Sequence, residues 1–153
     1  MAYLSTLAAL VWTVALVLPF SPFSYLPPII VGGGPGIWLV VAYVLFIVVG
    51  IGGFGALSAF LTTVELHEGR TLDPRTMWPA IVLLSIGVSG SCLLLALAGA
   101  VGGFAATFET TSVQSIDNLL SPYVDPITTL TLIAVFGAAL AVLSMVRARW
   151  PES

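Results

Sequence analysis

The segment ELHEGRTLDPR, residues 65–75, is the only part of the first 108 residues that carries charged side chains. Residues 1–64 before it and residues 76–108 after it contain no Asp, Glu, Lys or Arg. Both runs are longer than the roughly 20 apolar residues with which a helix crosses the hydrocarbon core of a membrane. The segment therefore predicts a short polar connection between two parts of the chain that lie in lipid.

The composition excludes an ordinary water-soluble domain. Of the 153 residues, 59% are hydrophobic and 7% are charged, and the mean hydropathy is +1.13. A soluble domain has about 25% charged residues, so lipid has to cover most of this surface. The net charge is −3, which is not the basic balance of a protein that binds nucleic acid. We therefore predict one integral membrane domain over residues 1–153, with the lipid bilayer as a partner and no nucleic acid.

Four segments have the length and apolar character of membrane-spanning helices. They cover residues 3–20, 37–65, 77–104 and 126–146. Pro19 is expected to end the first helix, because proline has no backbone donor and clashes with the preceding turn. We interpret this helix as retained rather than as a signal peptide, since no basic residue precedes it. The predicted fold is an all-α integral membrane protein, an antiparallel bundle of four transmembrane helices.

Two Asp-Pro pairs resemble helix starts, with Asp as the cap and Pro as the first helical residue. Asp73-Pro74 precedes the third predicted helix, and Asp125-Pro126 precedes the fourth. Between the third and fourth helices, residues 115–123 are expected to form a separate short helix at the membrane interface. Residues 21–36 are rich in Pro and Gly and are expected to form an apolar, non-helical loop that lies at the membrane interface or packs against another protein surface.

The arginines indicate how the chain is oriented. Arg70 and Arg75 follow the second predicted helix, and Arg147 and Arg149 follow the fourth. With four spanning helices both places lie on the same side, and arginine is retained on the cytoplasmic side of membranes. The sequence therefore predicts a multi-pass protein of the cell (plasma) membrane with both termini in the cytoplasm.

Small residues four apart in the sequence indicate close helix packing, since they let two helix backbones approach each other in lipid. The second and third predicted helices are accordingly expected to be antiparallel neighbours. A hinge or a groove that faces a cofactor is the alternative for the second helix. The residues of this predicted packing surface are Gly52, Gly55, Ala56, Ala59, Gly87, Ser91, Gly99 and Gly103.

Few residues suggest chemistry. The predicted spans hold no charged side chain in their cores, although such groups mark many ion and proton paths, and we predict no catalytic residue and no metal site. His67 is the only histidine, and histidine is the commonest ligand of metals and haem. A single histidine near water is more typical of a solvated loop, so haem bound at His67 is the weaker hypothesis. Cys92 lies in an apolar run, where cysteine behaves as a small hydrophobic residue.

Three functions remain open at this point. The first is a non-catalytic accessory subunit of a larger membrane protein complex, of the respiratory chain or another energy-transducing system, with other membrane subunits as partners. The second is a small transporter or channel that works as a homo-oligomer. The third is a haem-binding membrane electron carrier that uses His67. The first is preferred because the small-residue surfaces and the apolar loop at residues 21–36 both favour contact with other proteins.

Overall fold

The computed structural model describes residues 2–66, 69, 72–109 and 112–147. Over these residues the chain is helical and contains no strand, so the prediction of an all-α protein is confirmed. Three long apolar helices, Gly34–Leu66, Pro74–Phe108 and Val113–Val146, have the length and composition to cross a membrane within the described residues. The elements in order are α1 (Ala2–Val17), η1 (Phe23–Tyr25), α2 (Leu26–Val31), η2 (Gly34–Gly36), α3 (Ile37–Leu45), η3 (Phe46–Gly53), α4 (Phe54–Leu66), α5 (Pro74–Phe108) and α6 (Val113–Val146).

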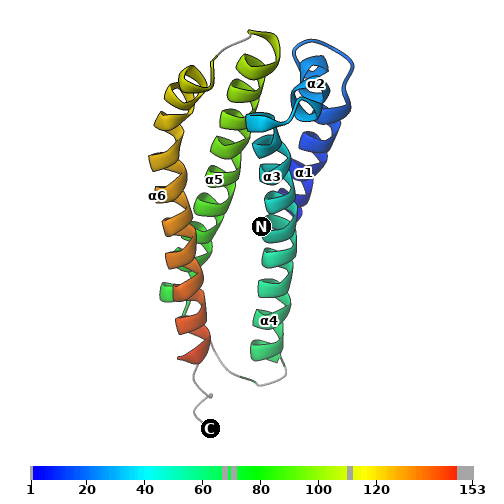
Figure 1. The fold of residues 1–153 in the computed structure, drawn as a ribbon. Coiled ribbons are helices and arrows are strands. Elements are labelled where there is room, and N and C mark those ends of the chain that lie inside the picture. The colour runs from blue at the N-terminus through cyan, green and yellow to red at the C-terminus, as the bar shows by residue number, and fades with distance from the viewer. Residues whose placement is uncertain (1, 67–68, 70–71, 110–111, 148–153) are drawn as a thin grey trace.

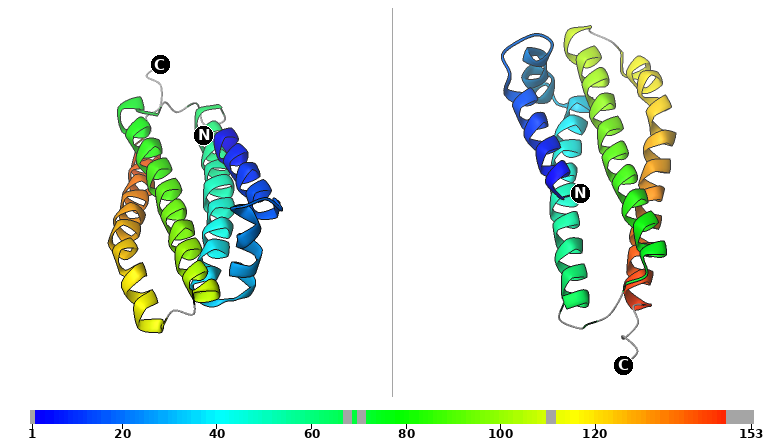
Figure 2. Two further views of the ribbon diagram at one scale, coloured as in Figure 1. Left: turned by 90° about the horizontal axis from the view of Figure 1, so that it is seen from above. Right: turned by 180° about the vertical axis from the view of Figure 1, so that it is seen from behind.

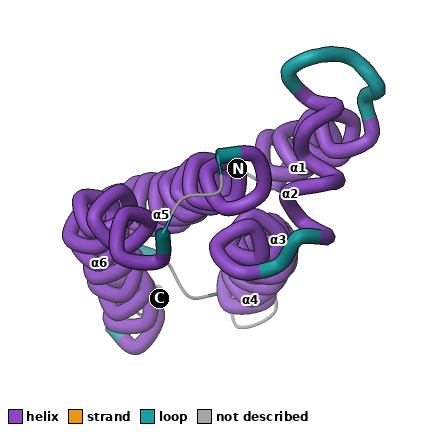
Figure 3. The backbone as a smooth tube through the Cα atoms, turned by 45° about the horizontal axis from the view of Figure 1, so that its top comes forward, coloured by secondary structure: helices purple, strands orange, loops and turns teal. Residues whose placement is uncertain are grey.

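The long helices lie side by side, with α5 between α6 and the rod formed by α3, η3 and α4 (Figures 1 and 3). α5 and α6 run in opposite directions and stay in contact along their length. The rod is nearest to α5 in its α3 part. α1 packs on η3 of the rod and next to α5, and α2 lies at the end of the bundle where α5 ends (Figures 1 and 2).

The first helix is shorter than predicted. α1 ends at Val17 rather than at residue 20, two residues before Pro19. Its 16 residues give a length of about 24 Å at 1.5 Å per residue, less than the roughly 30 Å of a hydrocarbon core. α1 begins about half-way along the bundle and runs to the end that carries α2 (Figures 1 and 2). The first predicted span is therefore a shorter apolar helix beside three long ones within the described residues.

The prediction of the third helix start is confirmed. The Asp73 side chain accepts a hydrogen bond from the Arg75 backbone N–H at 3.0 Å, and Pro74 is the first helical residue. α5 extends from this cap to Phe108, four residues beyond the predicted end at residue 104. Its 35 residues span about 52 Å, so α5 is longer than a bilayer of about 40–45 Å with its headgroups.

The predicted break at Asp125-Pro126 is wrong. α6 is one helix over Val113–Val146, capped by the Ser112 side chain, where the sequence suggested a short helix at 115–123 and a separate one at 126–146. Pro122 removes the backbone bond to the Asn118 carbonyl, and the Ser121 hydroxyl donates to that carbonyl at 3.2 Å instead. Serine side chains commonly satisfy carbonyls freed by proline in membrane helices, so the helix continues through the prolines.

Two local features, one in residues 21–36 and one in the middle of the rod, also differ from expectation. The loop at residues 21–36 contains three short helical turns, η1, α2 and η2, and buries Ile29 against α5. In the middle of the long rod, η3 is wound as a π-helix over eight residues that include Gly50, Gly52 and Gly53. Such wide turns are rare and often occur at functional positions. The rod therefore does not keep one regular helical pitch.

Candidate functional site

The small residues of α5 meet two different neighbours rather than one. A methyl group built on Gly99 would lie 2.5 Å from the Leu39 backbone nitrogen of α3, and one on Gly103 would lie 2.8 Å from Gly36 Cα of η2. Gly87, in contrast, is closed by the Ala134 backbone of α6, and Ser91 is half-buried with its hydroxyl bonded to the Val88 carbonyl at 3.1 Å. The expected partner of Gly87, the second predicted helix, is thus replaced by α6.

The small residues of η3 and α4 do not meet any neighbour in the described chain that needs their small size. Gly52, Gly55, Ala56 and Ala59 are all exposed. A methyl group on Gly52 would find only Ile47 O of its own segment, at 3.9 Å, and one on Gly55 would find no atom within 4 Å. The opposite side of α4 faces inward, where Phe54 and Val64 are buried. These four residues, called the open stripe below, therefore face away from the bundle.

The residues with potential redox or metal chemistry are not gathered into a site. His67 lies outside the described residues, so its haem hypothesis stays a prediction. Cys92 is buried with Ala9, Phe46 and Val88 in an apolar cluster between α1, η3 and α5. Among the side chains that the structure describes, no group of three His, Cys, Asp or Glu residues is placed to hold a metal ion.

One polar contact fixes α1 on the rod. The hydroxyls of Thr13 and Tyr43 are hydrogen-bonded at 2.7 Å, and Thr13 also donates to the Ala9 carbonyl at 2.8 Å. Trp12 packs edge-on against the Tyr43 ring, with centroids 5.8 Å apart. The hydroxyl partner of Tyr43 is therefore on α1. Tyr43 is partly buried, and α1 supplies the hydrogen-bond partner that a phenol takes when water is excluded.

Three apolar hollows lie along α5, the first two against α1, and together we call them the groove. Their volumes are about 250, 640 and 560 Å³. Ser89 lines the first two hollows, and Ala100 lines the second and third. The helical α5 residues of the groove are Ser85, Ser89, Leu93, Ala96, Leu97, Ala100, Val101, Phe104 and Ala105. They recur three and four residues apart, which places them on one side of the helix.

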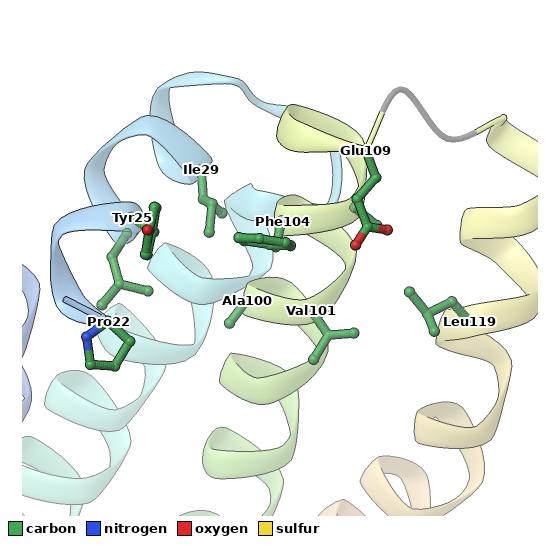
Figure 4. A pocket seen from close by; sticks show the side chains of 10 residues that line it. Pro22, Tyr25, Ile29, Ala100, Val101, Phe104, Glu109 and Leu119 are labelled. Carbon is green, nitrogen blue, oxygen red and sulfur yellow. The ribbon is translucent and has the colours of Figure 1, made fainter.

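The other wall of the groove comes from α1, and its outer end from η1 and α2. The α1 residues are Leu4, Leu7, Ala8, Val11, Trp12 and Ala15. At the outer end Tyr25 packs edge-on against Phe104 and Phe108, with ring centroids 6.0 and 5.7 Å away. Glu109 lines this end, and Figure 4 shows its carboxylate turned back along α5 on the side of Leu119. We call the lining residues Tyr25, Phe104 and Glu109, together with Phe108, whose ring packs on Tyr25 and Phe104, the aromatic–acid end of the groove.

The two ends of the bundle differ in charge: the end with Arg75 and Arg147 also carries the acids Glu65 and Asp73, whereas the charged residues described at the other end are all acids. Arg75 begins α5 and Arg147 ends α6, and the Thr76 hydroxyl donates to Ser144 Oγ at 3.2 Å between these two helices. The opposite end carries Glu109 and, near the start of α6, Asp117 and Asp125. The whole sequence has no basic residue in the segments that form that end. The groove therefore opens toward an acidic end.

Sequence reasoning missed the groove because its walls come from segments about 80 residues apart. The pattern on α5 alone, apolar at three- and four-residue intervals, is equally typical of any packed helix. A usable signal was present in Phe104, Phe108 and Glu109, an aromatic pair four apart followed by an acid. Comparison of the chain with protein-family models, with curated proteins and with solved structures found no match.

Proposed function

We propose that this chain is a small, non-catalytic integral membrane subunit that binds a larger membrane protein through its open stripe. The observation that supports the proposal most directly is the exposure of Gly52, Gly55, Ala56 and Ala59 on one side of η3 and α4. Glycine inside a helix costs about 0.5–1 kcal/mol relative to alanine. In lipid that cost is usually offset by close contact with another helix backbone.

The contrast with α5 explains why the stripe suggests a partner. Each of Gly87, Gly99 and Gly103 is closed by a neighbouring backbone atom within the chain. The same residue type on α4 has open space beside it. A helix from another subunit that packs there would close the stripe as α3 and α6 close the α5 glycines. The inward side of α4 is already used, since Leu57 and Leu61 pack on the cluster of Met77, Ala80 and Ala141.

For orientation, we propose that the end with Arg75 and Arg147 faces the cytoplasm. Arginine is retained on that side of membranes, and the two described arginines lie at the same end of the α5–α6 pair. The C-terminal end of α6 is then cytoplasmic, and the end with α2 and Glu109 faces outward. The N-terminal end of α1 points toward the arginine side but lies about half-way along the bundle, so the cytoplasmic N-terminus stays a prediction.

The test is purification of the full chain from its own membranes in mild detergent, followed by mass spectrometry of everything that migrates with it. We expect larger membrane subunits to co-purify with the chain in a fixed ratio, and identifying them would identify the complex. Replacing Ala56 with Leu should abolish this association, because the larger side chain fills the stripe. The matched control is Ala139→Leu, at an exposed alanine of α6, which should leave the complex intact.

Two results would contradict the proposal. One is a chain that migrates only with copies of itself, which would favour the homo-oligomeric transporter. The other is a complex that survives Ala56→Leu as well as Ala139→Leu, which would remove the stripe from the interface. Visible absorbance recorded on the same sample tests the haem hypothesis, since a Soret band lost on His67→Ala would support it.

A further inference from the structure

The two larger hollows of the groove have about the length of one leaflet of a bilayer. They cover α5 from Ser89 to Ala105, 16 helical steps, about 24 Å at 1.5 Å per residue. Half of a bilayer with its headgroups is about 20–22 Å thick. α1 supplies the second wall over the same part of the bundle, since it begins about half-way along and runs to the α2 end (Figure 2). A ligand that stands in one leaflet matches this shape.

The lining of the groove is suited to a hydrocarbon chain. Among the side chains that line the middle hollow, only Ser89 and the Trp12 indole carry a polar group. Small side chains, Ala96 and Ala100, form its floor on α5, and Leu93 and Leu97 stand 58% and 47% exposed beside them. Apolar lining with few polar groups is typical of sites for apolar ligands. The hydrocarbon part of a lipid can therefore lie along α5 from Ala100 to Ser89.

The outer end of the groove has the chemistry to bind a cation. The rings of Tyr25, Phe104 and Phe108 form one cluster, with the two phenylalanine centroids 5.0 Å apart. Glu109 adds a carboxylate on the same hollow. Aromatic faces attract ammonium groups, and a nearby carboxylate adds an opposite charge. Asp117 and Asp125 make the surrounding end acidic, so an anionic headgroup would be repelled there.

We propose that this groove is a binding site for one membrane lipid with an amine-bearing headgroup. Its chain lies against α1 and α5, and its ammonium group is held at the aromatic–acid end by Glu109. The site is on the opposite side of the rod from the open stripe, because Phe46 and Phe54 face the groove while Gly55 and Ala56 face outward. The proposal consequently does not depend on a partner subunit.

The experiment is native mass spectrometry of the full chain in detergent, titrated separately with phosphatidylethanolamine and phosphatidylglycerol that carry identical acyl chains. We expect the amine lipid to bind about tenfold more tightly, a ratio within reach of one cation–aromatic and carboxylate contact. Glu109→Gln should reduce that ratio to about twofold. Glu65→Gln, which removes an exposed acid at the other end of the bundle, should leave it unchanged. Equal affinities in the unaltered chain, or equal losses in the two variants, would overturn the proposal.

A second pair of variants tests the place of the hydrocarbon chain. Ala100→Trp fills the point where two hollows meet and should weaken both lipids by about tenfold or more. Ala139→Trp on α6 should weaken neither. Lipid affinities in Ala100→Trp that match those of the unaltered chain would place the lipid elsewhere and overturn the proposal. Circular dichroism shows whether each variant folds. If Ala100→Trp does not fold, the lipid ratio of Glu109→Gln, at the exposed end of α5, tests the proposal.

Discussion

The α5–α6 pair and the α3–η3–α4 rod use glycine in opposite ways. Along α5–α6, glycine lies at close contacts from one end of the pair to the other: Gly137 meets the Leu84 backbone, Gly87 meets the Ala134 backbone, and Gly102 meets the Leu120 side chain. The rod brings its backbone close to a glycine of α5 where α3 meets Gly99, and η3 and α4 pack on α5 through larger side chains. Farther along, its own Gly52 and Gly55 have no neighbour that needs a glycine.

The difference shows that a small-residue pair in a membrane helix does not identify its own partner. Such pairs permit close approach, but the contact is made wherever a second backbone arrives. For α5 both neighbours belong to the chain, and for α4 the stripe stays open. The internal contacts should therefore control the stability of the isolated chain, and the open stripe should control only what binds to it.

The largest loss of stability is expected from a substitution at the contact between α5 and α6. A side chain on Gly137 would meet the Leu84 backbone nitrogen at 2.5 Å and the Ala80 carbonyl oxygen at 3.0 Å. We expect Gly137→Leu to lower the free energy of unfolding by about 3 kcal/mol, since overpacking forces the helices apart. Thermal unfolding in detergent measures the loss.

The matched control is Gly55→Leu on the open stripe. Leu is a better helix former than Gly by about 0.8 kcal/mol, and open space surrounds this position. The isolated chain should therefore keep or slightly gain stability. If Gly55→Leu destabilised the chain as strongly as Gly137→Leu, the distinction between closed and open glycines would fail.

A smaller effect is expected where α3 meets α5. Gly99→Ala adds a methyl group 2.5 Å from the Leu39 nitrogen and 3.0 Å from the Trp38 carbonyl carbon. The rod can shift somewhat because it contacts α5 over a shorter length than α6 does, so we expect a loss of about 2 kcal/mol. Chemical crosslinking between cysteines placed on α3 and α5 should fall in parallel. Unchanged crosslinking and stability would show that this contact is looser than the structure has it.

The smallest effect concerns the attachment of α1. Tyr43→Phe keeps the ring contact with Trp12 and removes only the hydroxyl that is bonded to Thr13. Hydrogen bonds between membrane helices couple by about 0.6 kcal/mol on average, so a double-mutant cycle of Thr13→Val with Tyr43→Phe should give a coupling of that size. A coupling of zero would mean that the hydroxyls do not hold α1 on the rod.

Much of the fold follows from local sequence. Long charge-free runs predict long apolar helices, and the Asp73-Pro74 pair predicts the start of α5 because its capping bond involves only neighbouring residues. Asp125-Pro126 is the same residue pair, but no helix begins there. The helix is already capped by Ser112, and Ser121 satisfies the carbonyl freed by Pro122. A local motif is decisive only when the residues before it do not already form a helix.

The open stripe and the groove could not be predicted in full, because both depend on contacts between helices that are far apart in the sequence. The exposure of Gly55 and the closure of Gly99 are set by which helix packs where, and both positions look alike in the sequence. The groove needed α1 to stop short and lie beside α5, which juxtaposes Trp12 and Leu93 across it. The open stripe was predicted as a packing surface, but its orientation away from α5 was not.

The π-wound segment η3 has a consequence for insertions and deletions. Inward-facing residues recur every four positions through it, at Ala42, Phe46, Gly50 and Phe54, so three turns take twelve residues where 3.6 per turn would take about eleven. The rod thus holds about one surplus residue. Deleting Val48 should let the segment relax to α-helix and keep α4 in phase, with cooperative thermal unfolding retained. One residue deleted from regular α5 would instead turn every later side chain by about 100°.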